Sequence, residues 1–383
     1  MSHPSGGALE GIKVVELAGI GPGPFCAMML GDMGADVVRI DRIGGHPMNK
    51  QPRKNPHNRS RRSVAINLKS PEGIEAALNL IDKADALIEG FRPGVMERLG
   101  LGPEICLKRN KKLVYGRMTG WGQNGPLSQA AGHDINYLAI TGALHAIGTK
   151  ESGPVPPLNM VADYGGGGIF LAFGILAGIL SAKSTGSGQI VDAAMTDGVP
   201  LLLGGAHGRL AMGLWRDERE ANILDGAAYF YGSYECADGE WIALGSIEPQ
   251  FHQLLLEKLG LTEAHEFKDQ NNPDTWPAAR DKLRIVFKSQ PQQYWCDLLE
   301  NTDVCFGQVL SLQEAQNHPH NQARGTFINI ADTMQGAPAP RFSSTPASTP
   351  KQPPIAGEHN EEVLSEWGFN QEEIASLKSS GAI

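Results

Sequence analysis

Clustered cysteines, an excess of basic charge and a long apolar run are all missing from this sequence. The 383 residues contain five cysteines without CxxC spacing, which argues against a disulfide framework or a cysteine zinc site and indicates a reducing compartment. The net charge of −9 argues against a general nucleic-acid-binding protein, which would be basic over a whole face. The longest apolar run, residues 169–182, is too short to span a bilayer and predicts a buried core helix.

Two kinds of targeting signal are also missing from the ends of the sequence. The N-terminal MSHPSGGALEG contains no apolar signal core, and the C-terminal GAI is not the peroxisomal Ser-Lys-Leu address. We therefore expect an intracellular protein, cytoplasmic or, in a eukaryote, organellar. We expect neither a membrane nor a nucleic acid among its partners.

The stretch AGIGPGPFCAMMLGDMGADVVRIDR, residues 18–42, has the order of a glycine turn, a helix and a strand, and follows the strand-like GIKVVEL. Gly19 and Gly21 fit a G-x-G-x-x-G dinucleotide fingerprint, but Pro24 takes the place of the third glycine. Proline suits the first turn of a helix, so Pro24 is predicted to begin a helix over Phe25–Gly34. The stretch predicts a Rossmann-like start and disfavours a nicotinamide site.

The segment from residue 39 to residue 69 is basic, although the chain as a whole is acidic. It contains nine lysines and arginines against one acid, Asp41. This local excess predicts a ligand that carries several phosphates. Within the segment, we expect Arg53, Lys54 and Arg59 to be loop charges with small individual effects.

Strand-like and helical runs alternate through the first half of the chain, which predicts a doubly wound parallel sheet. Ser70 and Pro71 are suited to begin one of its helices. Further along, Asp238 and Gly239 predict the turn of a hairpin. These runs predict an α/β protein.

Three stretches contain candidate catalytic side chains, and each also has a structural explanation. His133 and Asp134 are adjacent in AGHDINYLAITG, although most histidines are not catalytic. Asp163 precedes four glycines in NMVADYGGGG, where an aspartate also suits a helix cap. Glu248 precedes a proline in ALGSIEPQF, which also suits a solvated helix start. No single stretch decides between the two explanations.

Taken together, these stretches resemble the α-methylacyl-CoA racemases, which belong to the family III CoA-transferase (CaiB/BaiF-type) superfamily. The resemblance covers nearly the whole chain, in order, through VVELAGIGPGPFCAMMLGDMGADVVRIDR, GRMTGWGQNGP, AGHDINYLAITG, LDGAA, YECADGEWIALGSIEPQF and GEHNEEVL. It implies an isomerase that epimerises 2-methylacyl-CoA thioesters by 1,1-proton transfer through an enolate. One alternative is a transferase that moves CoA between carboxylic acids with Asp163 as nucleophile. Another, of a different class, is a non-catalytic CoA- or nucleotide-binding module.

The resemblance also implies roles for individual residues. His133 and Asp163 would be the acid/base groups on opposite faces of the substrate α-carbon, and Asp134 would pair with Glu248 of the other subunit. Backbone amides after His133 are candidate donors to the enolate oxygen. Coenzyme A would enter as part of the acyl-CoA substrate, without a metal or another cofactor. The residues implied to bind it are Arg42, Ala65, Ile66, Asn67, Leu68, Glu89, Gly90, Phe91, Arg92, Arg98, Leu99, Gly132 and Tyr137.

The fold implied by the resemblance is α/β, with a Rossmann-like large domain, a small α+β domain and an interlocked homodimer. We expect five segments in chain order. They are a large CoA-binding domain over 1–198, a linker over 199–228, a small domain over 229–316, a second linker over 317–354, and a C-terminal segment over 355–383 that returns to the large domain.

Overall fold

Two units make up the chain in the computed structural model, which describes residues 6–46 and 50–383. The first unit consists of residues 1–141, 158–202 and 325–383, and the second of residues 142–157 and 203–324. The described part of the chain excludes residues 1–5, in the N-terminal stretch without a signal core, and residues 47–49 of the basic segment.

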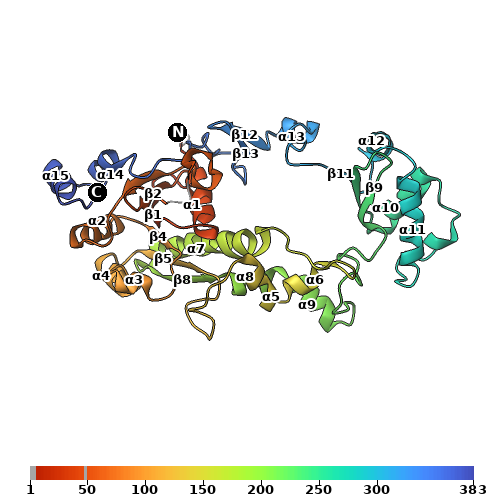
Figure 1. Ribbon diagram of the computed structural model, residues 1–383, viewed down its shortest axis with the longest axis horizontal. Helices are drawn as coiled ribbons and strands as arrows, with labels where there is room; N and C mark the ends of the chain where they lie inside the picture. The colour runs from red at the N-terminus through yellow and green to blue at the C-terminus, as the bar shows by residue number, and fades with distance from the viewer. Residues whose placement is uncertain (1–5, 47–49) are drawn as a thin grey trace. The chain divides into compact units, whose positions relative to one another are not determined.

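A six-stranded parallel sheet forms the centre of the first unit (Figure 1). Its strand order is β3-β2-β1-β4-β5-β8, the doubly wound order of Rossmann-like folds. The prediction of an α/β fold with a parallel sheet is thereby confirmed. The strands are β1 Lys13–Leu17, β2 Asp36–Asp41, β3 Arg62–Ala65, β4 Ala86–Glu89, β5 Val114–Thr119 and β8 Gln189–Ala194.

The central strands are buried on both faces, which explains their nearly continuous apolar sequence. Val15 of β1 pairs with Val38 of β2 on one side and with Leu87 of β4 on the other, and all three are fully buried. The other elements of the unit connect the strands or follow the sheet in the chain. They are α1 Pro22–Asp32, η1 Pro52–Lys54, η2 Pro56–Asn58, α2 Pro71–Ile81, α3 Val95–Arg98, α4 Pro103–Arg109, α5 Asp134–Ile140, η3 Met160–Ile169, α7 Phe170–Thr185, α8 Met195–Leu202, β12 Phe327–Ile330, β13 Thr333–Gly336, α14 Asn360–Glu366 and α15 Gln371–Ser379.

The first helix begins three residues earlier than the sequence predicts. It runs over Pro22–Asp32, not Phe25–Gly34, and Gly21 with a φ of 68° precedes it. Both Pro22 and Pro24 lie in the first turn, where backbone N–H groups have no intrahelical acceptor, so neither proline costs a hydrogen bond. By contrast, α2 begins as predicted, with Pro71 in its first turn and the Ser70 hydroxyl accepting from the Gly73 amide.

The apolar run at 169–182 belongs to a longer helical stretch than the sequence predicts. A π-helix, η3, leads directly into α7, so that Met160–Thr185 forms 26 continuous helical residues. By length and composition alone this stretch could cross a bilayer, but core helices of soluble proteins have the same properties. Here α7 packs against β5 and β8 (Figure 1). Half of the most apolar window of this stretch is buried within the protein.

The GEHN segment, Gly357–Asn360, covers the free edge of the sheet at β3. The Ala65 amide donates to Asn360 Oδ1 at 2.8 Å, and the Ser63 amide donates to His359 Nδ1 at 3.1 Å. The His359 amide in turn donates to the Ser63 carbonyl at 3.0 Å. Side chains and backbone of this segment therefore satisfy edge groups that would otherwise need another strand.

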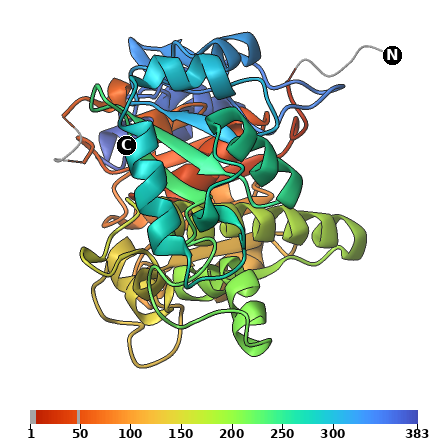
Figure 2. The same cartoon turned by 90° about the vertical axis from the view of Figure 1, so that its right-hand side faces the viewer.

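The second unit contains a three-stranded antiparallel sheet of order β11-β10-β9. The predicted hairpin is confirmed, since β9 and β10 pair around a turn at Asp238 and Gly239. Helices α10, α11 and α12 supply apolar side chains to a core shared with this sheet. Figure 2 draws the ribbons of these helices and strands in green to cyan. The elements are α6 Ala143–Ala146, β6 Gly148–Thr149, β7 Gly153–Pro154, α9 Gly204–Ala211, β9 Tyr231–Glu235, β10 Trp241–Gly245, α10 Pro249–Leu259, η4 His265–Phe267, α11 Trp276–Phe287, α12 Gln292–Leu299, β11 Phe306–Val309 and α13 Pro319–Arg324.

Candidate active site

The strand order of the large sheet reverses between β1 and β4. In doubly wound sheets, ligands bind outside the carboxyl ends of the strands at this switch point. The loop after β1 contains Gly19 and Gly21, and the loop after β4 contains Gly90, Phe91 and Arg92. The fold thus brings several residues that were singled out in the sequence to the carboxyl ends of the strands.

Asp163 lies inside the π-helix η3 and reaches the loop after β1. A Cβ atom added to Gly21 would lie 3.3 Å from Asp163 Oδ2. The same carboxylate oxygen accepts a hydrogen bond from Asn159 Nδ2 at 3.0 Å. Asn159, and not Asp163, holds the N-cap position. The helix-cap explanation of Asp163 is therefore wrong, and its side chain remains available for chemistry.

Glycines allow η3 to approach its neighbours this closely. A Cβ on Gly168 would lie 2.8 Å from the Phe25 ring, and one on Gly166 would lie 2.9 Å from Val199. The four glycines after Asp163 thus serve close packing against α1 and α8. π-Helices are rare and occur often at functional sites.

Asp134 joins the segments that carry His133 and Asp163. Its Oδ2 accepts hydrogen bonds from the amides of Ala162 at 2.9 Å and Asp163 at 2.8 Å. The side chain is buried, and its Oδ1 has no hydrogen-bond partner within the described residues. Asp134, which directly follows His133, therefore fixes the backbone turn that contains Asp163.

The surroundings of Asp163 raise its pKa. Burial makes the largest contribution, which the hydrogen bond from Asn159 opposes; the negative charge of Asp134 raises the pKa further, and His133 lowers it. The carboxylate consequently binds a proton more tightly than an exposed aspartate, as a catalytic acid/base group requires.

His133 is the N-cap of α5, and its side chain is exposed. Its amide donates to Asn136 Oδ1 at 3.0 Å. The next two amides, of Asp134 and Ile135, lie in the first turn of α5, where helix geometry provides no intrahelical acceptor. They are suitable donors to a developing negative charge.

Glu248 lies in the second unit, where it is the exposed N-cap of α10 and Pro249 occupies the first turn. Its expected position before a helix is confirmed. The structure thus brings together His133, Asp134 and Asp163 within one unit. The pairing of Asp134 with Glu248 stays a prediction.

Most charges of the basic segment pair with carboxylates of the same chain. Their number alone is therefore no argument for a ligand that carries several phosphates. Six of the nine cations in this segment form ion pairs with carboxylates. The pairs are Arg39–Asp41, Arg53–Glu358, Lys54–Asp332, Arg59–Asp32, Arg61–Glu16 and Arg62–Asp36. Among the described residues, Arg42, Lys50 and Lys69 have no such ion pair.

Arg59 is not the loop charge that the sequence predicts. Its guanidinium is buried, forms an ion pair with Asp32 at 2.6 Å, and donates to Gln335 Oε1 at 2.8 Å and to the Gly336 carbonyl at 2.7 Å. It ties α1 to the strand β13. Removal of such a buried charge would have a large effect on stability, since it would leave Asp32 unpaired.

The residues implied to bind coenzyme A differ in their exposure. Arg42, Arg92 and Arg98 are exposed, and within the described chain none of them forms an ion pair with a carboxylate. Glu89 is fully buried, where its carboxylate accepts from the Phe91 amide at 2.7 Å and from Arg117 at 2.9 Å. The remaining implied residues lie at or near the ends of elements. They end β3 (Ala65), follow it (Ile66, Asn67, Leu68), follow β4 (Gly90, Phe91), follow α3 (Leu99), precede α5 (Gly132) or belong to α5 (Tyr137).

Two residues near the site escaped the sequence argument. Asn159 precedes Asp163 by four positions, a spacing that brings side chains together on a helix. Arg117 of β5 holds Glu89 and also contacts Glu97 at 2.9 Å. A contact between strands has no local signal in the sequence.

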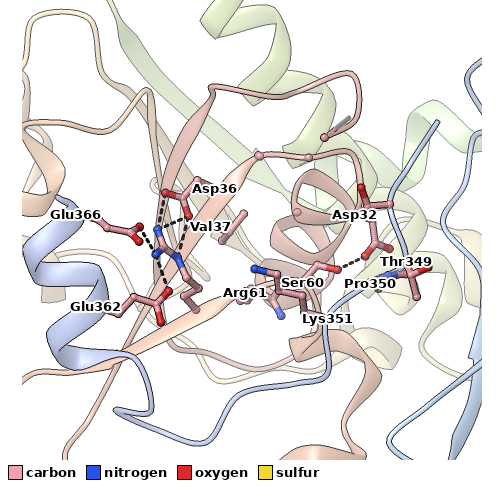
Figure 3. A pocket seen from close by; sticks show the side chains of 16 residues that line it. Asp32, Asp36, Val37, Ser60, Arg61, Thr349, Pro350, Lys351, Glu362 and Glu366 are labelled. Atoms are coloured by element: carbon pink, nitrogen blue, oxygen red, sulfur yellow. Dashed lines mark hydrogen bonds and ion pairs between the residues drawn. The ribbon is translucent and has the colours of Figure 1, made fainter. Parts of the chain in front are cut away.

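A cavity of about 420 Å³ lies at the opposite edge of the large sheet (Figure 3). Its lining includes Asp36 and Arg62, the first residues of β2 and β3. Arg62 forms ion pairs with Asp36, Glu362 and Glu366, and Ser60 donates to Asp32 at 2.6 Å. Because these charges already pair with one another, the cavity is explained by the scaffold.

Known proteins are similar to this chain over nearly its whole length. The model of CoA-transferase family III matches residues 9–360. The α-methylacyl-CoA racemase of Mus musculus is 45% identical over 373 residues, covering 97% of this chain and 96% of that protein. The enzyme of the same name from Homo sapiens is 43% identical over 379 residues, covering 98% and 97%. The crystal structure of a CaiB/BaiF family protein from Brucella suis has a TM-score of 0.81 at 24% identity, covering 94% and 100%, and bears on the fold alone.

Proposed function

This chain belongs to CoA-transferase family III, and we propose that within this family it is an α-methylacyl-CoA racemase. The reaction is epimerisation of a 2-methylacyl-CoA thioester by 1,1-proton transfer through an enolate. The observation that carries the proposal is the Asp134 carboxylate, which holds the Asp163 amide and directly follows His133. Two groups able to exchange protons are thereby tied to one turn at the ligand-binding edge of the sheet.

The proposed chemistry follows from the properties of the two groups. One of them removes the proton from the carbon beside the thioester, and the other returns a proton to the opposite face. Histidine exchanges protons near neutral pH, and burial raises the pKa of Asp163 toward that range. The proton count balances without a redox group, because the proton lost on one face is replaced on the other. Each positioned acid/base group typically contributes about 10²–10⁴-fold to the rate.

The enolate oxygen needs a donor that is already in place. The amides of Asp134 and Ile135 at the start of α5 satisfy this need, and the partial positive charge of a helix N-terminus adds to it. A donor of this kind is worth about 10²–10³-fold.

For the CoA part of the substrate, we propose contacts between its phosphates and Arg42, Arg92 and Arg98. Exposed guanidinium groups without internal carboxylate partners are free to form charge-assisted hydrogen bonds with phosphate. Arg42 follows β2 and Arg92 follows β4, so both lie at the carboxyl edge of the sheet.

We further propose an interlocked homodimer in which Glu248 completes the site of the other subunit. An exposed apolar face on the continuous helix of η3 and α7 supports an interface. Phe173 and Leu180 are about 70% exposed, and with Ile169 their spacing of four and seven residues places them on one side of that helix. A contiguous apolar surface of this kind usually marks an interaction site.

Incubation of one pure epimer of a 2-methylacyl-CoA in deuterated water tests the reaction. We expect both epimers to appear, with deuterium at the α-carbon, and His133→Ala to lose this exchange. Transfer of the acyl-bound CoA to added carboxylic acids, without exchange, would establish the transferase alternative. Unchanged exchange from both epimers in His133→Ala would disprove the two-base assignment.

Co-expression of Asp163→Asn with Glu248→Gln tests the shared site. In a two-fold dimer that shares its sites, a mixed dimer has one site with both substitutions and one with neither. Random pairing makes half of the dimers mixed, so about a quarter of all sites should be intact. Activity no higher than that of the separate variants, with mixed dimers verified by mass, would refute the shared site.

A further inference from the structure

Tyr137 of α5 makes a contact that bears on the catalytic histidine. Its hydroxyl donates to the Gly132 carbonyl at 2.6 Å, and its side chain is buried. The ring meets Trp121 edge to face, with the centroids 4.7 Å apart. Tyr137 is therefore anchored at both its ring and its hydroxyl.

Two glycines make room for this ring. A Cβ on Gly120 would lie 2.0 Å from the Tyr137 ring, and a Cβ on Gly132 would lie 2.8 Å from it. Neither glycine has a positive φ, so space and not backbone conformation requires them. The glycines of two separate motifs, GRMTGWG and AGHDINY, thus accommodate the same side chain.

The peptide group between Gly132 and His133 is held on both sides. Its carbonyl accepts from Tyr137, and its N–H donates to Asn136 Oδ1 at 3.0 Å. Both clamping side chains come from the helix that follows. The backbone on the far side of His133 is fixed as well, because the Asp134 carboxylate binds the amides of the Asp163 turn.

We propose that Tyr137 and Asn136 are positioning residues, which clamp the peptide before His133 and so aim its imidazole at the substrate α-carbon. The inference rests on the proposed racemase function and revises the role of Tyr137 from a CoA contact to a group that acts through His133. A displacement of about 1 Å in a catalytic group can cost about 10²-fold in rate, so such a clamp has a measurable consequence.

The electrostatic surroundings keep Tyr137 a donor. Burial first and the charge of Asp163 second raise the pKa of its phenol, while Arg92 lowers it. The net direction is upward, so the hydroxyl keeps its proton at neutral pH. The same interactions place the phenol within electrostatic reach of both the catalytic carboxylate and an arginine proposed to bind CoA.

Tyr137→Phe tests the clamp, with Tyr115→Phe as its control. The Tyr115 hydroxyl also donates to a backbone carbonyl, that of Leu101 at 2.8 Å, and its side chain is likewise buried. We expect Tyr137→Phe to lower kcat for deuterium exchange by roughly threefold to tenfold, the scale of one hydrogen bond, without weakening CoA binding. Tyr115→Phe should lower the melting temperature comparably and leave kcat unchanged.

Asn136 provides an independent test, since its side chain is exposed and its substitution should not prevent folding. Asn136→Ala should lower kcat, whereas Asn136→Asp, which keeps an acceptor oxygen, should restore it. Wild-type kcat with weakened CoA binding in Tyr137→Phe would overturn the inference, as would equal kcat in Asn136→Ala and the wild type. Failure of the proposed function is distinct, because the wild-type protein itself would then show no exchange.

Discussion

The basic segment and the candidate active site, formed by His133, Asp134 and Asp163, differ in how their charges are partnered. In the basic segment six of nine cations form ion pairs with carboxylates, and three of these pairs are buried. At the candidate active site, the Asp163 carboxylate accepts a hydrogen bond from the neutral side-chain amide of Asn159. Pairing stabilises the ionised forms of scaffold groups, whereas burial is the largest of the effects that raise the pKa of Asp163. In the basic segment, charge pairing therefore stabilises the scaffold, whereas the hydrogen bond to the Asp163 carboxylate comes from a neutral side chain.

Asp163→Asn should produce the largest effect, because it removes an acid/base group and leaves the fold intact. We expect α-proton exchange to fall by about 10²–10⁴-fold. Asp192→Asn is the matched control. Asp192 also has a raised pKa from burial, but it lies on β8, where it accepts from the Gln123 amide at 3.2 Å. A comparable loss of exchange in both variants would show that Asp163 has no specific role as an acid/base group.

Arg61→Ala should produce the largest loss of stability. Arg61 Nε lies 2.7 Å from Glu16 Oε2, both side chains are fully buried, and the guanidinium also donates to the carbonyls of His57 and Pro24. Burial lowers the pKa of Arg61 to about 10, so the guanidinium keeps its charge at neutral pH. Removal of one partner of such a pair typically costs about 3–5 kcal/mol.

Urea unfolding of Arg61→Ala measures this cost, and Arg53→Ala serves as the exposed control. The Arg53–Glu358 pair is about one-third exposed on each side, and exposed pairs contribute about 0–1 kcal/mol. The double variant Glu16→Leu with Arg61→Met leaves no buried charge unpaired and should be more stable than Arg61→Ala. Equal losses for the buried and the exposed pair would remove the distinction between them.

Pairing of this kind explains which parts of the structure the sequence could predict. Local patterns identified the parallel sheet, the start of α2 at Pro71 and the hairpin at Asp238 and Gly239, because each depends on neighbouring residues. The count of basic residues was a poor guide to the ligand, because carboxylates from distant parts of the chain pair with them. Asp32 pairs with Arg59 over a separation of 27 positions, and Glu358 pairs with Arg53 over a separation of 305 positions. A sequence shows a charge but not its distant partner.

The candidate site shows the same division. His133, Asp134 and Asp163 were identified through motifs, and their proximity follows from the fold. The capping of the Asp163 turn by Asp134 was not predictable, because it joins residues 29 positions apart across a π-helix that no local pattern announces. Asn159 was missed for a simpler reason, since an asparagine before an apolar run also suits an ordinary helix cap.

Arg42→Ala examines a cation that donates to the Gly45 carbonyl but has no carboxylate partner among the described residues. A charge-assisted hydrogen bond to phosphate is worth about 1.5–3 kcal/mol, so CoA affinity should fall about tenfold or more. Arg109→Ala also removes one positive charge, but that guanidinium is paired with Asp82 at 2.7 Å, and its loss should leave CoA affinity unchanged. Calorimetric titration with CoA compares the two. Equal affinity of Arg42→Ala and the wild type would exclude Arg42 from the site.

The smallest expected effect is on the pH dependence of stability. With rising pH, the contribution of Asp163 to stability should fall, whereas that of Glu358 should rise. The folded-state pKa of Asp163 is raised, chiefly by burial, so the folded protein binds this proton more tightly than the unfolded chain. Stability from this group falls as pH rises from the ordinary aspartate pKa through the raised value. The folded-state pKa of Glu358 is lowered, chiefly by the hydrogen bond from Arg53. Its stabilisation is present above the ordinary glutamate pKa and is lost as pH falls through the lowered value.

Neutral replacements make this difference in sign measurable. Asp163→Asn should raise the melting temperature at neutral pH, and the gain should disappear below the ordinary aspartate pKa. Glu358→Gln should lower the melting temperature at neutral pH, and the loss should shrink as the solution is acidified. Melting curves at several pH values check both slopes. A lower melting temperature for Asp163→Asn at neutral pH would mean that the ionised carboxylate stabilises the fold, and that Asp163 belongs with the paired charges of the scaffold.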